Sequence, residues 1–144
     1  MDIKKEQAQK LNDKLKYYKN TLINKIAEFR KVYKTTSELD IECYKKNNHE
    51  CMTQFENFER TVLDFDRRMD KERDELHQVC WYTTPRSLRP ENEFEWNYTS
   101  EETIQALFNF EKCASPYYEK CVKLVEEKIK VAHEAAKRLK KFNE

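Results

Sequence analysis

The sequence contains no glycine and only three prolines, Pro85, Pro90 and Pro116, among its 144 residues. Glycine and proline supply most tight turns, so their scarcity argues against a β-sheet protein. The absence of glycine also excludes a glycine-rich phosphate-binding loop, in which the backbone must approach the phosphate closely. We therefore expect a chain dominated by helices.

Long hydrophobic runs are also absent. No uncharged run approaches the roughly 20 residues that cross a bilayer, and the opening MDIKKEQAQK lacks the apolar core of a secretory signal. Its mixture of acids and bases makes a poor transit peptide. Hydrophobic and charged residues each make up 38% of the chain, which leaves little material for a thick core. We expect a soluble or peripheral protein whose helices are covered partly by another surface.

Charge is unevenly distributed although the net charge is only +1. Residues 1–34 carry a net charge of +6, residues 119–144 carry +3, and the segment between them carries −8. The basic ends could meet anionic lipid headgroups or nucleic acid, while a solvated helix face is the more common explanation for spaced lysines. The acidic centre argues against nucleic-acid binding.

Hydrophobic periodicity predicts a single all-α domain over residues 1–144. Thr35-Thr36-Ser37 and Ser115-Pro116 are expected to interrupt helices, and Thr99 to Glu102 resembles a capping box. We predict helices at 1–36, 38–80, 99–114 and 115–144, with a proline- and tryptophan-containing loop at 81–98. Apolar residues recur every three or four positions in the three long helices: Leu11, Leu15, Tyr18, Leu22, Ile26, Phe29, Tyr33; Phe55, Phe58, Val62, Phe65, Met69, Leu76, Val79; Tyr118, Val122, Val125, Ile129, Ala132, Ala136, Leu139.

Five cysteines stand out in this charged chain. Cys43 and Cys51 are eight residues apart, as are Cys113 and Cys121, and Cys80 lies between the pairs. Residues eight apart on one helix are separated by about 12 Å, too far for a disulfide. Either the pairs bridge two antiparallel helices, Cys43 to Cys121 and Cys51 to Cys113, or Cys43 and Cys51 close a loop while Cys80 bonds Cys121 or Cys113. Both arrangements give a disulfide-stapled helical hairpin.

Other chemistry is weakly indicated. His49 and His77 could join Cys43 and Cys51 in a zinc site, but the spacing of a common zinc module is missing. Trp81 and Trp96 could anchor a partner, or simply pack the loop onto the helices. Acidic residues follow one another at the spacing of a solvated helix face, and we assign no catalytic or cofactor-binding residue; these acids are Asp64, Asp66, Asp70 and Glu72.

Three short blocks carry a resemblance to a known family. The runs DIECYKKNNHECM, DELHQVC and YYEKCVKLVEE resemble the PDSW subunit family of mitochondrial respiratory complex I, over roughly residues 15–135. Cys43, Cys51, Cys80 and Cys121 match the family's four cysteines in order. The first pair is one residue wider than in the animal family, and an inserted loop and helix supply Cys113, which could replace Cys121 as the partner of Cys80.

The resemblance implies a non-catalytic accessory subunit on the intermembrane-space side of the inner membrane. Such a subunit contacts other complex I subunits, lies peripherally against lipid, and binds no NADH, flavin, iron–sulfur cluster or quinone. Cysteine pairs without a secretory signal agree with an intermembrane-space location. A second hypothesis is a soluble paired-cysteine factor of that compartment that acts in assembly or metal delivery, which would show a labile metal or a reactive thiol.

Overall fold

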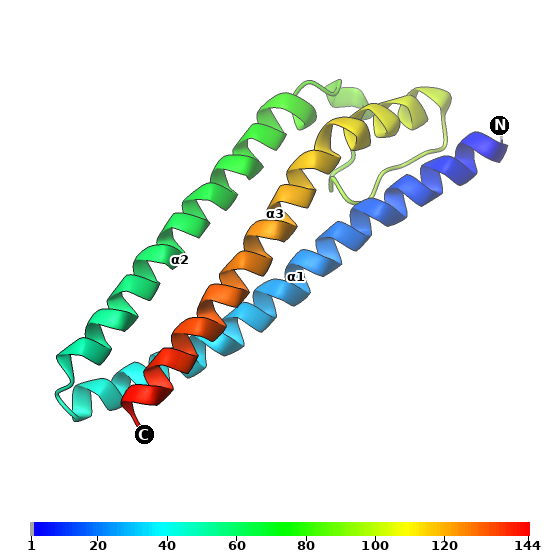
Figure 1. The fold of residues 1–144 in the computed structure, drawn as a ribbon. Helices are drawn as coiled ribbons and strands as arrows, with labels where there is room; N and C mark the ends of the chain where they lie inside the picture. Colours follow the sequence, from blue (N-terminus) through cyan, green and yellow to red (C-terminus); the bar gives the residue numbers. More distant parts are fainter. Residues whose placement is uncertain (1) are drawn as a thin grey trace. The chain divides into compact units, whose positions relative to one another are not determined.

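The fold is all-α, as predicted. The computed structural model describes the backbone of residues 2–144 and the side chains from Ile3 onward. Its elements are α1 (Asp2–Lys45), α2 (His49–Leu76), a π-helical turn (His77–Trp81), a 3-10 helix (Arg86–Leu88) and α3 (Glu101–Phe142) (Figure 1). None of these described residues belongs to a β-strand. The predicted start of the first helix at residue 1 lies outside the described residues.

Helix α1 runs through its predicted end. The Thr35 hydroxyl donates to the carbonyl of Lys31 at 3.2 Å, and the Thr36 hydroxyl donates to the carbonyl of Val32 at 2.8 Å. Each hydroxyl therefore bonds within the preceding helical turn and does not cap a new helix. The predicted boundary between 1–36 and 38–80 is wrong, because the helix continues nine residues past 36 and α1 ends at Lys45.

Helix α3 runs through Ser115 and Pro116, where a restart was predicted. The Ser115 hydroxyl donates to the Glu111 carboxylate at 2.6 Å, so it does not act as a helix cap. Pro116 is exposed and lies inside the helix. The predicted helices 99–114 and 115–144 are therefore one element. Its cap is Ser100, one residue later than predicted, whose side-chain oxygen accepts the Thr103 amide proton at 3.2 Å.

Helix α2 ends in a turn of different geometry. After Leu76 the chain widens into the π-helical turn, in which the Tyr82 amide donates to the His77 carbonyl at 2.8 Å. The turn rotates the hydrophobic stripe, so Val79 is 50% exposed although it was predicted to face the core. The other predicted stripe residues of the three long helices are buried or half-buried.

The chain forms two compact units. Unit 1 comprises Met1–Leu22 and Asp70–Val122, and unit 2 comprises Ile23–Met69 and Lys123–Glu144. Each unit takes segments from α1, α2 and α3, because these helices continue from one unit into the other. The prediction of a single domain stays a prediction.

The core of unit 1 lies between the first half of α1, the first half of α3 and the loop that precedes α3 (Figure 1). Trp96 is buried, with its ring 5.1 Å from that of Phe110, and Trp81 lies 5.7 Å from Phe110. The Trp96 amide donates to the buried Asn12 side chain at 2.9 Å, which fixes the loop against α1. Both tryptophans therefore pack the loop onto the helices.

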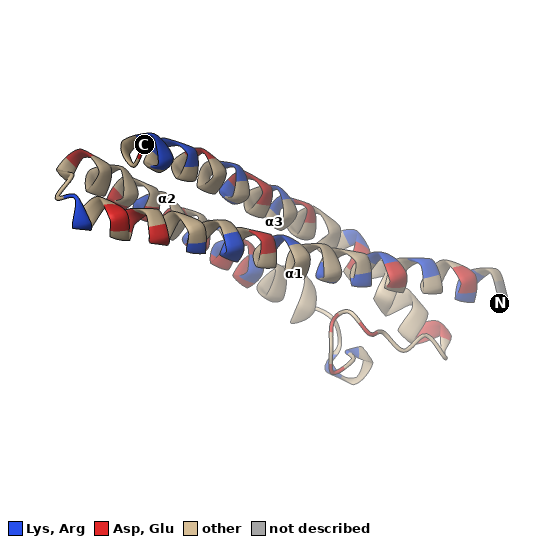
Figure 2. Ribbon diagram, turned by 90° about the horizontal axis from the view of Figure 1, so that it is seen from below, with Lys and Arg blue, Asp and Glu red and all other residues tan. Residues whose placement is uncertain are grey.

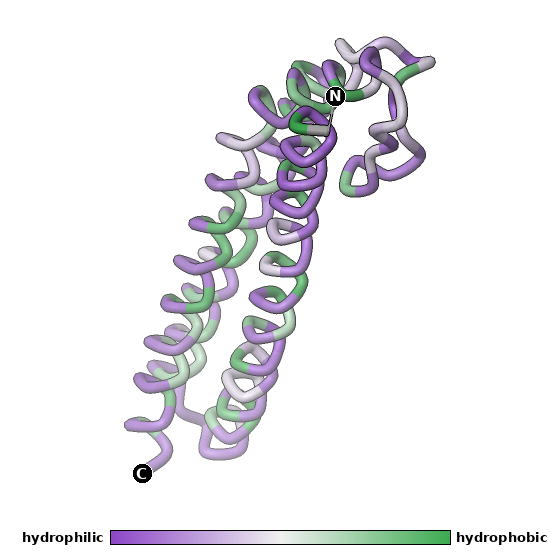
Figure 3. Tube along the Cα trace, turned by 90° about the vertical axis from the view of Figure 1, so that its right-hand side faces the viewer, coloured by the Kyte–Doolittle hydropathy of each residue, from purple (hydrophilic) through white to green (hydrophobic). Residues whose placement is uncertain are grey.

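The core of unit 2 is a three-helix arrangement with an aromatic cluster between α1 and α2. Tyr33 lies 5.8 Å from Phe58 and from Phe29, ring to ring. On α3 the small side chains Ala132 and Ala136 are buried, which allows close approach of the neighbouring helices. Figure 3 shows hydrophobic residues recurring along each helix, and Figure 2 shows lysines, arginines and acids alternating along the same helices.

Candidate functional site

The turn between α1 and α2 brings Cys43 and Cys51 together. Asn47 adopts a left-handed conformation, φ 52°, that glycine usually takes at the end of a helix. The Asn48 amide donates to the Cys43 carbonyl at 2.9 Å, and the Asn47 amide donates to the Tyr44 carbonyl at 3.0 Å. These two bonds satisfy carbonyls at the end of α1 and reverse the chain direction.

Asn48 also starts α2. Its side-chain oxygen accepts the Cys51 amide proton at 3.1 Å, which is the hydrogen bond of a helix N-cap. Cys43 and Cys51 form a disulfide with a Cα–Cα distance of 5.7 Å, and both are fully buried. The bridge ties the end of α1 to the first turn of α2.

A second disulfide joins Cys80 in the π-helical turn to Cys113 on α3, again with a Cα–Cα distance of 5.7 Å. The Thr84 hydroxyl donates to the Cys80 carbonyl at 2.8 Å, so the chain after the turn is held close to the bridge. This disulfide closes a connection of 33 residues, which contains the whole loop before α3. The loop is thereby fixed at both ends.

Cys121 is the one cysteine of the described chain outside a disulfide, and it is buried. Burial, helped by the nearby Glu72 carboxylate and opposed by Arg73, raises the pKa of its thiol to about 11. At pH 7 only on the order of one molecule in ten thousand carries the thiolate, which is the nucleophile and the metal ligand. The side chain is suited to packing and poorly suited to reaction.

The cysteine pairs thus differ from two of the expectations. The inter-helix scheme, Cys43 to Cys121 and Cys51 to Cys113, is wrong, because the turn at Asn47 and Asn48 makes Cys43 and Cys51 partners. The disulfide role that the resemblance implied for Cys121 is also wrong. Cys113 on α3 bonds Cys80 in its place.

The zinc arrangement is not formed. The sulfur atoms of Cys43 and Cys51 bond each other and offer no thiolate, and His49 is exposed at the start of α2. His77 lies in the π-helical turn beside Glu93, with 3.6 Å between Nε2 and the carboxylate. Within residues 2–144 no three His, Cys, Asp or Glu side chains are grouped so that they could hold a metal ion.

The acidic residues of α2 lie on its surface or pair with basic neighbours. Asp64 is exposed, Asp66 pairs with Lys128 of α3, and Asp70 pairs with Arg73 one turn away at 3.3 Å. Glu72 is half-buried, 3.8 Å from the ammonium of Lys120. Pairs of this kind contribute little to stability.

A polar cluster in unit 1, half-buried except for the buried Tyr118, was not predicted from the sequence. It joins Glu93 of the loop, His77 of the π-helical turn and Tyr118 of α3. Burial raises the pKa of the Glu93 carboxyl, and the neighbouring His77 and Tyr118 only partly offset that effect. Burial also raises the pKa of the Tyr118 hydroxyl, and the Glu93 charge adds to the shift. Three segments far apart in sequence form the cluster, so no local motif indicates it.

Comparison with protein-family models, curated proteins and solved structures finds no match. None of the helices in residues 2–144 has the length and hydrophobicity that a membrane span requires. Any proposal about function therefore rests on the sequence and structure of this chain.

The polar cluster is chemically suited to holding the loop. Phe94 packs 5.5 Å from the Tyr118 ring, which stacks on Tyr18 at 5.4 Å. Phe94 follows Glu93 in the loop, so its packing on Tyr118 holds this part of the loop against α3. Within unit 1, the Cys80–Cys113 disulfide and this cluster both connect segments around the loop.

Proposed function

We propose that this protein is a non-catalytic structural subunit of the membrane arm of mitochondrial complex I, held peripherally on the intermembrane-space side. The observation that carries the proposal is the combination of two disulfides, one of them fully buried, with large hydrophobic side chains left on the surface. The first feature braces the helices in an oxidising compartment. The second suits a chain that docks on other proteins.

The exposed hydrophobic residues support the docking role. In unit 2, Tyr44 is 61% exposed and Leu63 is 57% exposed, on helices whose buried faces are already occupied. A subunit of a larger assembly can bury such side chains against its neighbours. The full set of such residues is Ile3, Tyr17, Ile23, Ile41, Tyr44, Leu63, Val79 and Tyr82.

The titratable groups support a role in binding. Cys121 is buried with a raised pKa, and Glu93 and Tyr118 lie under packed aromatic rings. We propose accordingly that the chain acts on no small-molecule substrate and holds no NADH, flavin or quinone. Its partners are neighbouring subunits of the complex and the lipid beside them.

The test is a native gel of mitochondria that carry the tagged chain at its normal level. We expect co-migration with complex I, and loss of co-migration when Leu63→Asp and Tyr44→Asp place charges on the exposed apolar surface of unit 2. The matched control is Lys34→Asp with Arg60→Asp, two exposed positions of the same unit that carry no apolar surface. Migration of the wild-type chain only as a small free protein contradicts the proposal.

A further inference from the structure

We propose that the groove between α1 and α3 in unit 2 binds the phosphate group of an anionic phospholipid. The groove has a volume of about 350 Å³, within the range of ligand sites in proteins. The inference deepens the peripheral lipid contact of the proposed function and rests on it only for the source of the phosphate. Its lining residues are Lys31, Val32 and Thr35 of α1, and His133, Ala136, Lys137 and Lys140 of α3.

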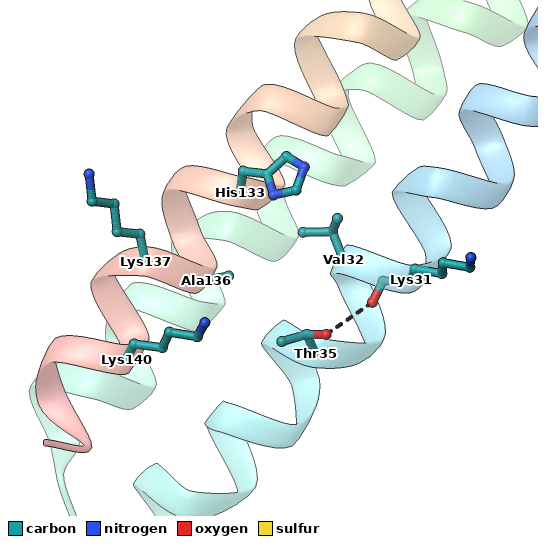
Figure 4. A pocket seen from close by; sticks show the side chains of 7 residues that line it. All are labelled: Lys31, Val32, Thr35, His133, Ala136, Lys137 and Lys140. Atoms are coloured by element: carbon teal, nitrogen blue, oxygen red, sulfur yellow. Dashed lines mark hydrogen bonds between the residues drawn. The ribbon is translucent and has the colours of Figure 1, made fainter.

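The lining combines an apolar floor with a basic rim. Figure 4 shows Val32 and Ala136 between the two helices, and the His133 ring leaning over them. Lys140 lies beside the lower part of the groove, while the ends of Lys31 and Lys137 extend outward on opposite sides. Because lysine side chains turn freely on their long stems, ammonium groups from both helices can close on one anion.

No carboxylate lines this groove, and that distinguishes it from the rest of unit 2. Elsewhere in the unit, Lys25 pairs with Glu126 at 3.3 Å and Lys128 pairs with Asp66. Within the described residues, the ammonium groups of the three groove lysines, at positions 31, 137 and 140, make neither an ion pair nor a hydrogen bond. Three lysines without a compensating carboxylate around one groove attract an anion.

The other grooves of unit 2 lack this property. The groove between α1 and α2 is lined by Glu59 and Asp66 together with Arg30 and Lys128. The groove between α2 and α3 is lined by Glu134 and Arg138. Both contain charges of each sign, which neutralise one another, whereas the lining of the α1–α3 groove carries one sign of charge.

The apolar floor favours a lipid over a free phosphate ion. A phospholipid carries its phosphate next to a glycerol backbone and acyl chains, so apolar surface and ammonium groups are both used. A free phosphate ion gains nothing from Val32 and Ala136. Each lysine near an anionic membrane surface contributes enough attraction that loss of three reduces partitioning by about 100-fold.

The test measures co-sedimentation of the purified, oxidised full-length chain with phosphatidylcholine vesicles, with and without about one-fifth phosphatidylglycerol, at about 50 and 150 mM salt. We expect binding only to the anionic vesicles, weaker at the higher salt. The triple variant Lys31→Gln, Lys137→Gln, Lys140→Gln should lose about 100-fold in partitioning. Thr35→Glu, which adds a carboxylate at an exposed position of the groove, should weaken binding while the lysines remain.

The matched control is Lys34→Gln with Arg60→Gln and Arg67→Gln, which removes three charges from exposed positions of unit 2 outside the groove. It should retain most of the binding. An equal loss of vesicle binding in the control contradicts the groove as the binding site, because the vesicles then respond only to the net charge of the chain. A second experiment titrates the chain with inorganic phosphate. If phosphate binds but the vesicles do not, the lipid is excluded as the ligand and the groove is assigned to the free ion.

The two proposals fail separately. If the wild-type chain co-migrates with complex I but does not bind anionic vesicles, the lipid-binding proposal is wrong and the proposed function still holds. A wild-type chain that binds the vesicles through the groove but migrates free overturns the proposed function alone.

Discussion

Two adjacent asparagines reverse the chain between α1 and α2 in a protein without glycine. Asn47 takes the left-handed conformation and Asn48 caps the next helix. Asparagine visits this region at lower cost than other residues with a side chain. The close approach of Cys43 and Cys51 therefore depends on the identity of residue 47.

We predict that Asn47→Val lowers the free energy of unfolding by about 1–2 kcal/mol, because a β-branched residue is strained at positive φ. Asn47→Gly should change it by less than about 0.5 kcal/mol. Chemical denaturation of the oxidised protein measures both. Lys45→Val, a valine in the last turn of α1, is the control and should cost only about 0.5 kcal/mol. Equal losses for the two valine variants contradict the role of the left-handed residue.

Glu93 is expected to make stability depend on pH. Its pKa in the folded protein is raised above the ordinary value of 4.5 by burial, so ionisation is costlier in the folded state than in the unfolded one. Its contribution is therefore fully favourable below pH 4.5 and is lost as the pH rises through the folded pKa. Glu93→Gln removes that loss.

We predict that Glu93→Gln raises the free energy of unfolding at pH 7 relative to the wild type, and that the gain disappears as the pH falls toward 4. Denaturation curves at several pH values measure the difference. Glu95→Gln, an exposed neighbour in the same loop, is the control and should show no such trend. A gain that is constant across this range excludes ionisation of Glu93 as its source.

At the scale of elements, the helices were predictable and their boundaries were not. The stripes from Leu11 to Tyr33 and from Tyr118 to Leu139 indicate helices, because burial of one face determines where a helix packs. The breaks at Thr35 and Ser115 were wrong because each hydroxyl bonds within its own helix. Propensity for capping is a local preference, and continuous tertiary packing on both sides overrides it.

Pro116 lies inside α3, and its replacement is predicted to change the stability of this helix. Pro116 cannot donate a backbone hydrogen bond, and a proline in a helix interior costs about 3 kcal/mol relative to alanine. We predict that Pro116→Ala raises the free energy of unfolding by about 1–3 kcal/mol, since the more flexible unfolded chain offsets part of the gain. Thermal or chemical denaturation measures it, and Pro90→Ala in the loop should give no gain. Unchanged or lower stability in Pro116→Ala contradicts a continuous strained helix.

The disulfide pairing and the polar cluster could not be read from sequence for the same reason. Cys113 and Cys121 have similar local surroundings, and only the course of the chain around the π-helical turn selects Cys113. Likewise His77, Glu93 and Tyr118 come together only once the loop has packed against α3. Contacts between distant segments depend on tertiary structure, which periodicity does not encode.

For the whole molecule, the two disulfides should differ in their effect on stability. A bridge restricts the unfolded chain more when it closes a longer loop. The Cys80–Cys113 separation is 33 residues and the Cys43–Cys51 separation is 8. We predict that Cys80→Ser with Cys113→Ser costs about 3.7 kcal/mol and that Cys43→Ser with Cys51→Ser costs about 2.5 kcal/mol. Denaturation of both double variants measures the order, and a reversed order contradicts the loop-closure account.

The most direct test of the account is disulfide mapping of the mature protein by mass spectrometry without reduction, with alkylation before and after denaturation. We predict peptides linked through Cys43–Cys51 and Cys80–Cys113, and a Cys121 that is alkylated rapidly only after denaturation, since burial raises the pKa of its thiol. A bridge that contains Cys121, or five cysteines that all react in the native protein, would contradict the claim that these two disulfides brace the helices.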